Sequence, residues 1–261
     1  MTSRDKLVVL TVDLEVPMPC KHALIKNKTL FKECLELVRE WCHRLLRKLK
    51  KMHITATFFT EGFLARLMPE LVAEVAEEGH EIACHGHYHY PLVWLSIDKA
   101  REEVRKARRT LEDVLGRPPL GFRAPRFMVN QKVLQVLEDE GFLYDSSIVP
   151  FWRPRRYRHL WVPRLPFFPT PKKKLIELPV SVVNMLRLPL GLPWMNRVGG
   201  SLFFKLLKLF GTTNPIVIYL HLHDLPGKGL KNLLSLLTYL RRRGVFIKAI
   251  SLVSSLVEGR R

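Results

Sequence analysis

The chain has 261 residues, 47% of them hydrophobic, which is enough to bury a core and excludes a largely disordered protein. Its 43 lysines and arginines outnumber 24 acidic residues, which gives an unusually high formal net charge of +19. No apolar run is long enough to span a membrane or to serve as a signal peptide, so we expect a cytoplasmic protein. The four cysteines lack C-x-x-C spacing, which argues against a disulfide framework.

Short apolar runs alternate with amphipathic helical patterns along most of the chain. The first half predicts strands at 7–12, 54–60 and 81–84, a short strand before Arg123, and helices at 30–51, 69–78, 97–115 and 131–140. The second half predicts strands at 175–179, 215–220 and 245–250 and a helix at 230–243. This alternation of strands and helices predicts an α/β fold with a parallel sheet or barrel.

The alternation is interrupted between residues 150 and 171 by six prolines among arginines and aromatic residues. Because strands resume afterwards, we interpret about 150–174 as a basic, proline- and aromatic-rich excursion within one domain, 1–261, and not as a linker. From 146 to 223 the chain has twelve lysines and arginines against one acid, Glu177. Basic residues among aromatics can bind nucleic acid, an anionic glycan or a membrane surface, and a solubilising surface is the alternative.

Polar residues follow directly after several predicted strands. They are Asp13, Glu15, His85, His89, Arg123 and His221. The carboxyl ends of parallel strands lie at one rim of a barrel, where the loops after the strands build active sites. We therefore expect these residues to meet, which favours an enzyme over a scaffold.

The histidine pair and the acidic pair can hold a metal ion. Asp13 and Glu15 are spaced to share one side of a strand, and His85 and His89 to share one side of a helical turn. Two imidazoles and a carboxylate suit zinc and leave a position open, which is typical of a catalytic site. The alternatives are a surface histidine pair and a turn residue at Asp13. His87 is expected to point elsewhere, toward a substrate, a supporting position behind the ligands or the surface.

These segments resemble the motifs of the polysaccharide deacetylases of carbohydrate esterase family 4, which share the NodB-homology domain. Residues 11–15 (TVDLE) look like the first motif, 79–89 (GHEIACHGHYH) like the second and 121–125 (GFRAP) like the third. Residues 141–147, 199–205 and 219–221 look like the branch found with exopolysaccharide biosynthesis. The resemblance covers most of the chain.

The resemblance implies a distorted (β/α) barrel with about seven parallel strands. It implies a metal-dependent hydrolase that removes an N-acetyl or O-acetyl group from an amino sugar or polysaccharide. Glu15, His85 and His89 would bind one divalent metal ion, with zinc as the expected ion.

The resemblance also implies the catalytic groups. Asp13 would be the general base, Arg123 would hold Asp13 in place, and His221 would protonate the leaving amine. The acid that orients His221 is less evident. Glu177 is the first candidate and Asp224 the second, and a Glu177 that only neutralises nearby arginines is the alternative.

The chain departs from the family pattern at two positions. Leu14 stands where the first motif commonly has its second acid, so metal binding would pass to Glu15. Arg126 stands where many members have an aromatic residue, which would change contacts with the substrate. Two alternatives stay open: a deformylase or amidase acting on a lipid-linked sugar at an anionic membrane surface, and a non-catalytic glycan-binding barrel. No nucleic-acid partner is expected.

Overall fold

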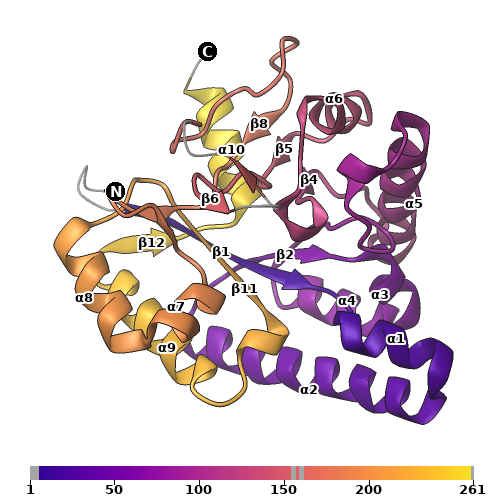
Figure 1. Cartoon of the computed structure of the whole chain (residues 1–261), viewed down its shortest axis with the longest axis horizontal. Coiled ribbons are helices and arrows are strands. Elements are labelled where there is room, and N and C mark those ends of the chain that lie inside the picture. Colours follow the sequence, from indigo (N-terminus) through magenta and orange to yellow (C-terminus); the bar gives the residue numbers. More distant parts are fainter. Residues whose placement is uncertain (1–5, 154–156, 159–161, 260–261) are drawn as a thin grey trace.

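The computed structural model describes residues 6–153, 157–158 and 162–259 (Figure 1). Within these residues, the main sheet contains seven parallel strands in the spatial order β11 (Ile216–His221), β1 (Lys6–Leu14), β2 (Thr57–Thr60), β3 (Glu81–Cys84), β4 (Gly121–Phe122), β5 (Tyr144–Asp145) and β8 (Ile176–Glu177). An additional strand, β12 (Gly244–Phe246), pairs in parallel with the start of β1. The predicted α/β fold with about seven parallel strands is confirmed.

The sheet curls toward closure because the chain that leaves β8 returns to β11. The backbone N–H of Ser181 donates to the carbonyl oxygen of Val217 at 2.9 Å, and Gly191 forms an isolated parallel bridge with Tyr219. The hairpin of β9 (Val182–Val183) and β10 (Leu188–Pro189) lies beside this junction. The strands therefore form a half-barrel whose carboxyl ends share one rim.

Helices surround the sheet (Figure 1). They are α1 (Met18–Lys26), α2 (Lys28–Met52), α3 (Gly62–Leu67), α4 (Pro69–Glu77), α5 (Ile97–Leu115), α6 (Gln131–Asp139), α7 (Leu192–Val198), α8 (Gly200–Phe210) and α9 (Gly229–Arg241). In the excursion, β6 (Trp152–Arg153) and β7 (Tyr157–Arg158) form a separate antiparallel pair. Residues 154–156 and 159–161 of the predicted excursion lie outside the described residues.

Helix α5 shows why the central helices were predictable. The side chain of Ser96 accepts a hydrogen bond from the N–H of Lys99, and Gly116 ends the helix with a φ of 69°. Apolar side chains recur at helical spacing and are buried: Ala100, Val104, Ala107 and Leu111. Both helix ends and the buried face are thus specified locally.

Helix α10 (Ala249–Glu258) was not predicted and corrects the end of the strand expected at 245–250. The backbone N–H of Ala249 donates to Thr57 Oγ1 at 2.9 Å, and that of Ile250 donates to Glu81 Oε2 at 3.0 Å. Its apolar face packs on inward-facing strand residues, among them Val9 and Tyr144. The helix therefore closes the amino-terminal end of the barrel, because residues 57 and 81 begin β2 and β3, and leaves the opposite rim open.

The sequence argued against a disulfide framework, and the structure contains one disulfide that its spacing did not predict, while Cys42 and Cys84 are free. Cys20 and Cys34 form a disulfide with a Cα–Cα distance of 5.7 Å, which joins α1 to α2. The spacing gave no signal because the sulfur atoms meet only when the two helices turn back on each other. Among the described helices, none combines the length and the apolar character that crossing a membrane requires.

Candidate active site

A cavity of about 580 Å³ opens at the carboxyl ends of β1 and β11. Its lining includes Asp13, Glu15, His85, His89, Arg126, Phe127, Trp194, Arg197, Tyr219, His221 and His223. Five of the residues singled out from the sequence as catalytic or metal-binding therefore meet here, and Arg123 lies directly behind them. The predicted convergence at one rim is observed in the structure.

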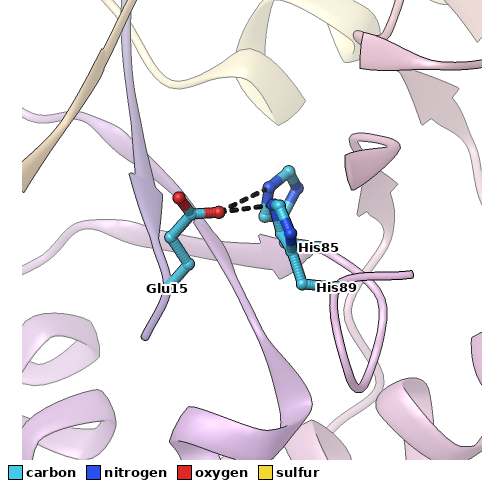
Figure 2. Close-up of side chains that lie close together, drawn as sticks. All are labelled: Glu15, His85 and His89. Atoms are coloured by element: carbon cyan, nitrogen blue, oxygen red, sulfur yellow. Dashed lines mark ion pairs between the residues drawn. The ribbon is translucent and has the colours of Figure 1, made fainter. Parts of the chain in front are cut away.

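Glu15, His85 and His89 form the candidate metal-binding cluster of the cavity (Figure 2). Glu15 follows the end of β1, and its Oε2 atom lies 2.6 Å from His89 Nε2 and 3.4 Å from His85 Nε2. The histidines do not lie on a helical turn, as the i, i+4 spacing had suggested. They lie in the loop after β3, where positive φ angles at Gly86 (72°) and His89 (62°) bring the two rings together.

The hydrogen bonds of this cluster determine which atoms face inward. His85 Nδ1 lies 2.8 Å from the carbonyl oxygen of Arg123, and a carbonyl only accepts, so Nδ1 carries the proton. Nε2 is then the ring nitrogen of His85 that faces Glu15. Burial favours the neutral form of His89 and lowers its pKa, although Glu15 opposes this shift. The Nε2 atoms of both imidazoles thus face the same carboxylate oxygen, and the tautomer of His85 is fixed by its bond to Arg123.

Glu15 itself is held in its ionised form. Burial alone would raise the pKa of its carboxyl, but the imidazoles of His85 and His89 beside it, together with the positive charge of His221, hold the pKa well below its usual value. Its Oε2 atom is buried and has no hydrogen-bond partner that meets normal geometry within the described part of the chain. Two imidazole nitrogens and a carboxylate oxygen that lie within 4.8 Å of one another are ligands of the kind that zinc takes, so this donor set fits a divalent metal.

Buried contacts position the chain around Glu15. Glu61, in the loop after β2, accepts hydrogen bonds from the backbone N–H of Val16 and from Lys21 Nζ of α1. Burial raises the pKa of Glu61 to about 7, although the ammonium of Lys21 opposes the shift. Sequence reasoning missed this pair because neither residue lies in a recognised motif.

Asp13 and Arg123 form a buried ion pair beside the candidate metal-binding cluster. Arg123 Nη1 donates to Asp13 Oδ1 at 2.7 Å and to Thr11 Oγ1 at 2.8 Å. Its Nε and Nη2 atoms donate to the carbonyl and hydroxyl oxygens of Ser146. With the guanidinium held from three sides, one carboxylate oxygen of Asp13 is fixed and the other is left facing the cavity.

His221 faces that second oxygen from the end of β11. Its Nε2 atom lies 3.5 Å from Asp13 Oδ2, and its Nδ1 atom lies 2.9 Å from Asp224 Oδ2. Burial opposes protonation of His221, but the hydrogen bond to Asp224 and the charges of Asp13 and Glu15 prevail and raise its pKa to about 9. The imidazole is therefore protonated at neutral pH and can donate a proton.

Asp224, and not Glu177, is the acid that orients His221. Glu177 is fully buried and accepts from the backbone N–H of Ile148 at 2.9 Å. Burial and the neighbouring carboxyl of Asp145 raise the pKa of Glu177 well above its usual value. The first choice made from the sequence is wrong because Glu177 is turned toward β5 in the interior.

His87 points away from the other two histidines, as expected, but it does not reach the cavity or the surface. Its ring is buried and packs edge-on against Tyr88 with centroids 4.5 Å apart. A Cβ atom added at Gly62 would lie 2.6 Å from His87 Nδ1, so α3 packs directly on this ring. Burial lowers the pKa of His87 to about 4, and we conclude that it is a neutral core residue.

Other lining residues were not singled out individually from the sequence. Trp194 and Arg197 lie on α7, which the sequence did not predict, and His223 stacks on His221 with ring centroids 4.7 Å apart. The only signal for the first two was the excess of basic and aromatic residues between 146 and 223. Arg126 lines the cavity, as its place after the third motif had suggested.

The fold and the cavity together define an α/β half-barrel protein whose polar site is built from the loops after the strands. The sequence model of the family described as polysaccharide deacetylase matches residues 2–144, more than half of the chain. The chain therefore belongs to the polysaccharide deacetylase family.

Two relatives and one solved structure illustrate the relationship. The chain is 28% identical over 106 residues to a peptidoglycan deacetylase of Helicobacter pylori and 28% identical over 100 residues to a peptidoglycan-N-acetylmuramic acid deacetylase of Bacillus subtilis. These alignments cover 41% and 38% of this chain but only 36% and 38% of the two relatives, so the chain matches little more than a third of their length. A crystal structure of a "putative polysaccharide deacetylase" from Mycobacterium smegmatis superimposes with a TM-score of 0.75, covering 100% of this chain and 93% of that one at 22% identity, which establishes the fold.

Proposed function

We propose that the protein is a metal-dependent deacetylase that removes an acetyl group, most simply an N-acetyl group, from an amino sugar or polysaccharide. One observation carries the proposal: the Glu15, His85 and His89 cluster lies in the same cavity as an arginine-held Asp13 and a protonated His221. Binding a glycan requires no such combination, so the non-catalytic barrel is disfavoured. The names of the two relatives, a peptidoglycan deacetylase and a peptidoglycan-N-acetylmuramic acid deacetylase, agree with deacetylation of a carbohydrate.

The metal proposed for the cluster is zinc. Glu15, His85 and His89 would hold it, and the bound ion would supply a Lewis acid that polarises the acetyl carbonyl and makes water a nucleophile near neutral pH. Three protein ligands leave room for water and substrate. The hydrogen bond from His85 Nδ1 to the carbonyl of Arg123 supports this role, since it fixes the ring with Nε2 inward.

Asp13 is the proposed general base. Arg123 holds one of its oxygens, so the other can accept a proton from the attacking water without the side chain turning away. His221 is the proposed general acid. Asp224 holds its Nδ1 atom, so Nε2 carries the proton that passes to the departing nitrogen of the sugar.

An anionic membrane surface is a second proposed partner, and a patch of exposed apolar side chains supports it. Met185, in the turn between β9 and β10, is 82% exposed, and Leu209 of α8 is 73% exposed. Asn184 N–H donates to the carbonyl of Gly211 at 3.0 Å, which brings this turn against the end of α8. Between 178 and 223 the sequence contains no acidic residue, so the surroundings of the patch attract anionic headgroups.

A membrane location would suit a lipid-linked sugar as substrate. This alternative, together with deformylation in place of deacetylation and the exopolysaccharide branch, remains a prediction from the sequence. The absence of a nucleic-acid partner and the single-domain organisation are likewise predictions.

The test of the proposed function is release of acetate or formate by the purified chain from chitooligosaccharides, peptidoglycan fragments and lipid-linked amino sugars. Metal content is measured on the same preparation. We expect acetate from at least one amino sugar, and release slower by about 10²- to 10⁴-fold from the Asp13→Asn variant, which keeps the shape of the site. Equal acetate release by Asp13→Asn and the parent chain would contradict the proposal.

A further inference from the structure

Two arginines lie on the lining of the cavity without a role in the chemistry proposed above. Arg126 belongs to the short 3-10 helix Pro125–Phe127 after β4, and Arg197 lies in the last turn of α7. Their Cζ atoms lie 5.9 Å from the ring centroid of Trp94 and 5.7 Å from that of Trp194. Each guanidinium group thus lies near an aromatic ring, and Arg197 is exposed whereas Arg126 is half-buried.

Neither arginine has an acidic partner in the described part of the chain. Within residues 6–153, 157–158 and 162–259, no carboxylate forms an ion pair with Arg126 or Arg197, whereas the buried Arg123 has Asp13 as its partner. The acids of the cavity lining are Asp13 and Glu15, and both are already engaged by Arg123 and the histidines. The outer part of the cavity therefore carries positive charge that nothing in its lining offsets.

The backbone fixes the positions of both arginines on the cavity lining. Arg126 and Phe127 adopt left-handed φ angles of 60° and 58°, a costly conformation for residues with side chains. On the other side, Asn196 Nδ2 donates to the carbonyl of Asp224 at 2.9 Å, which ties α7 to the turn that orients His221. Arg197, the next residue, is thereby held on the lining of the cavity that also contains His221.

We infer that the substrate carries an anionic group, a phosphate or a carboxylate, close to its acetamido group, and that Arg126 and Arg197 bind this anion. Guanidinium groups bind phosphate and carboxylate through paired, charge-assisted hydrogen bonds and lose less hydration than ammonium groups. Stacking on Trp94 and Trp194 limits their side-chain motion and so reduces the entropy lost on binding. The inference rests on the proposed function because it takes the same cavity as the substrate site.

The test compares sugars that differ mainly in the anion. N-acetylglucosamine is the neutral reference, N-acetylglucosamine 1-phosphate adds a phosphate, and N-acetylmuramic acid adds a carboxylate. For each sugar, kcat/KM for acetate release is measured with the parent chain, Arg126→Gln, Arg197→Gln and Arg66→Gln. Arg66 is a matched control, because its Cζ atom lies 5.6 Å from the Phe63 ring but outside this cavity.

We expect the parent chain to prefer at least one anionic sugar over the neutral one. The sugar with the larger preference, phosphate- or carboxylate-bearing, identifies the anion. Each cavity variant should reduce this preference about tenfold, mainly through KM, while Arg66→Gln keeps it. Acetate release without any preference for an anionic sugar, or a preference that survives both cavity substitutions, would overturn the inference and leave the proposed function intact.

A binding measurement separates the two ideas further. Titration calorimetry with the Asp13→Asn variant reports binding of N-acetylglucosamine 1-phosphate and N-acetylmuramic acid without turnover. Binding of either sugar that weakens when Arg126→Gln and Arg197→Gln are added supports the inference even if no acetate is released by the parent chain. If both sugars bind equally well with and without the two arginine substitutions, the inference is contradicted.

Discussion

Arg123 donates a hydrogen bond to Asp13 over 2.7 Å, and both side chains are almost completely buried. The pair links the residue that follows β4 to β1 across the sheet. The second carboxylate oxygen of Asp13, Oδ2, faces His221. An ion pair in this position both stabilises the folded chain and fixes the orientation of the proposed base. The two contributions can be separated by substitution.

Asp13→Asn should lose about 10²- to 10⁴-fold in turnover, the usual contribution of a general base, while it stays folded because Asn keeps an acceptor for Arg123. Arg123→Ala should lose activity and also about 3–5 kcal/mol of unfolding free energy, since it leaves a carboxylate buried without its partner. Kinetics and urea denaturation of both variants provide the measurements. An Arg123→Ala chain as stable as the parent would show that the pair has no structural role.

The pH dependence of activity should depend on Asp224. The pKa of His221 is raised to about 9, so the proposed acid stays protonated at neutral pH and activity should fall only as the pH rises through that value. Asp224→Asn removes the charge that favours the protonated imidazole, so the pKa falls and the alkaline limb of kcat should move to lower pH by about one unit or more. The profile is compared with that of Glu177→Gln, which does not touch His221. If the alkaline limb of kcat stays at the same pH in Asp224→Asn, the limb reports the titration of another group.

Glu177→Gln should change how stability depends on pH. Burial and the charge of Asp145 raise the pKa of Glu177 in the folded state, so the folded chain retains a proton that the unfolded chain releases. The stability linked to this proton is complete at pH values below the unfolded pKa, and it is lost as the pH rises through the folded pKa. Gln cannot ionise and still presents an oxygen to Ile148, so the variant should gain stability relative to the parent as pH rises. Thermal unfolding of both chains between pH 5 and pH 9 checks the sign of this effect. A parent chain whose stability rises relative to that of the variant at high pH would contradict the prediction.

How much of this could be read from the sequence depends on distance along the chain. Asp13 and His85 were placed correctly at one rim because each directly follows an apolar strand, and parallel strands bring such ends together. The loop that turns His89 back on His85 depends on positive φ angles that the i, i+4 spacing does not reveal. The mistaken choice of Glu177 over Asp224 has a similar origin, because the contact with Asp145 exists only once β5 and β8 are neighbours.

Tertiary packing also determines where α10 begins and which cysteines form the disulfide. Residues 245–250 form a short, mostly apolar run that suits a strand, yet the chain leaves β12 at Phe246 and begins a helix at Ala249. The bonds to Thr57 and Glu81 that start this helix come from residues far away in the sequence. No local pattern records such contacts.

The exposed patch near α8 predicts salt-sensitive binding to anionic vesicles. Replacing Met185 and Leu209 by Asp should abolish flotation with phosphatidylserine-containing liposomes at low salt, because it removes apolar contacts and adds negative charge. Leu37→Asp is the matched control, as Leu37 is 54% exposed on α2. If the parent chain fails to float, or the double variant floats equally well, the patch does not bind membranes.

The central claim is that Glu15, His85 and His89 hold a metal ion that the reaction requires, and elemental analysis paired with acetate release tests it most directly. We expect one divalent ion, zinc, per parent chain, and loss of both the ion and acetate release in Glu15→Ala and in the His85→Ala and His89→Ala double variant. Asp13→Asn should keep the ion and lose only activity. Full metal occupancy in the double histidine variant, or undiminished acetate release by chain stripped of metal, would contradict the account.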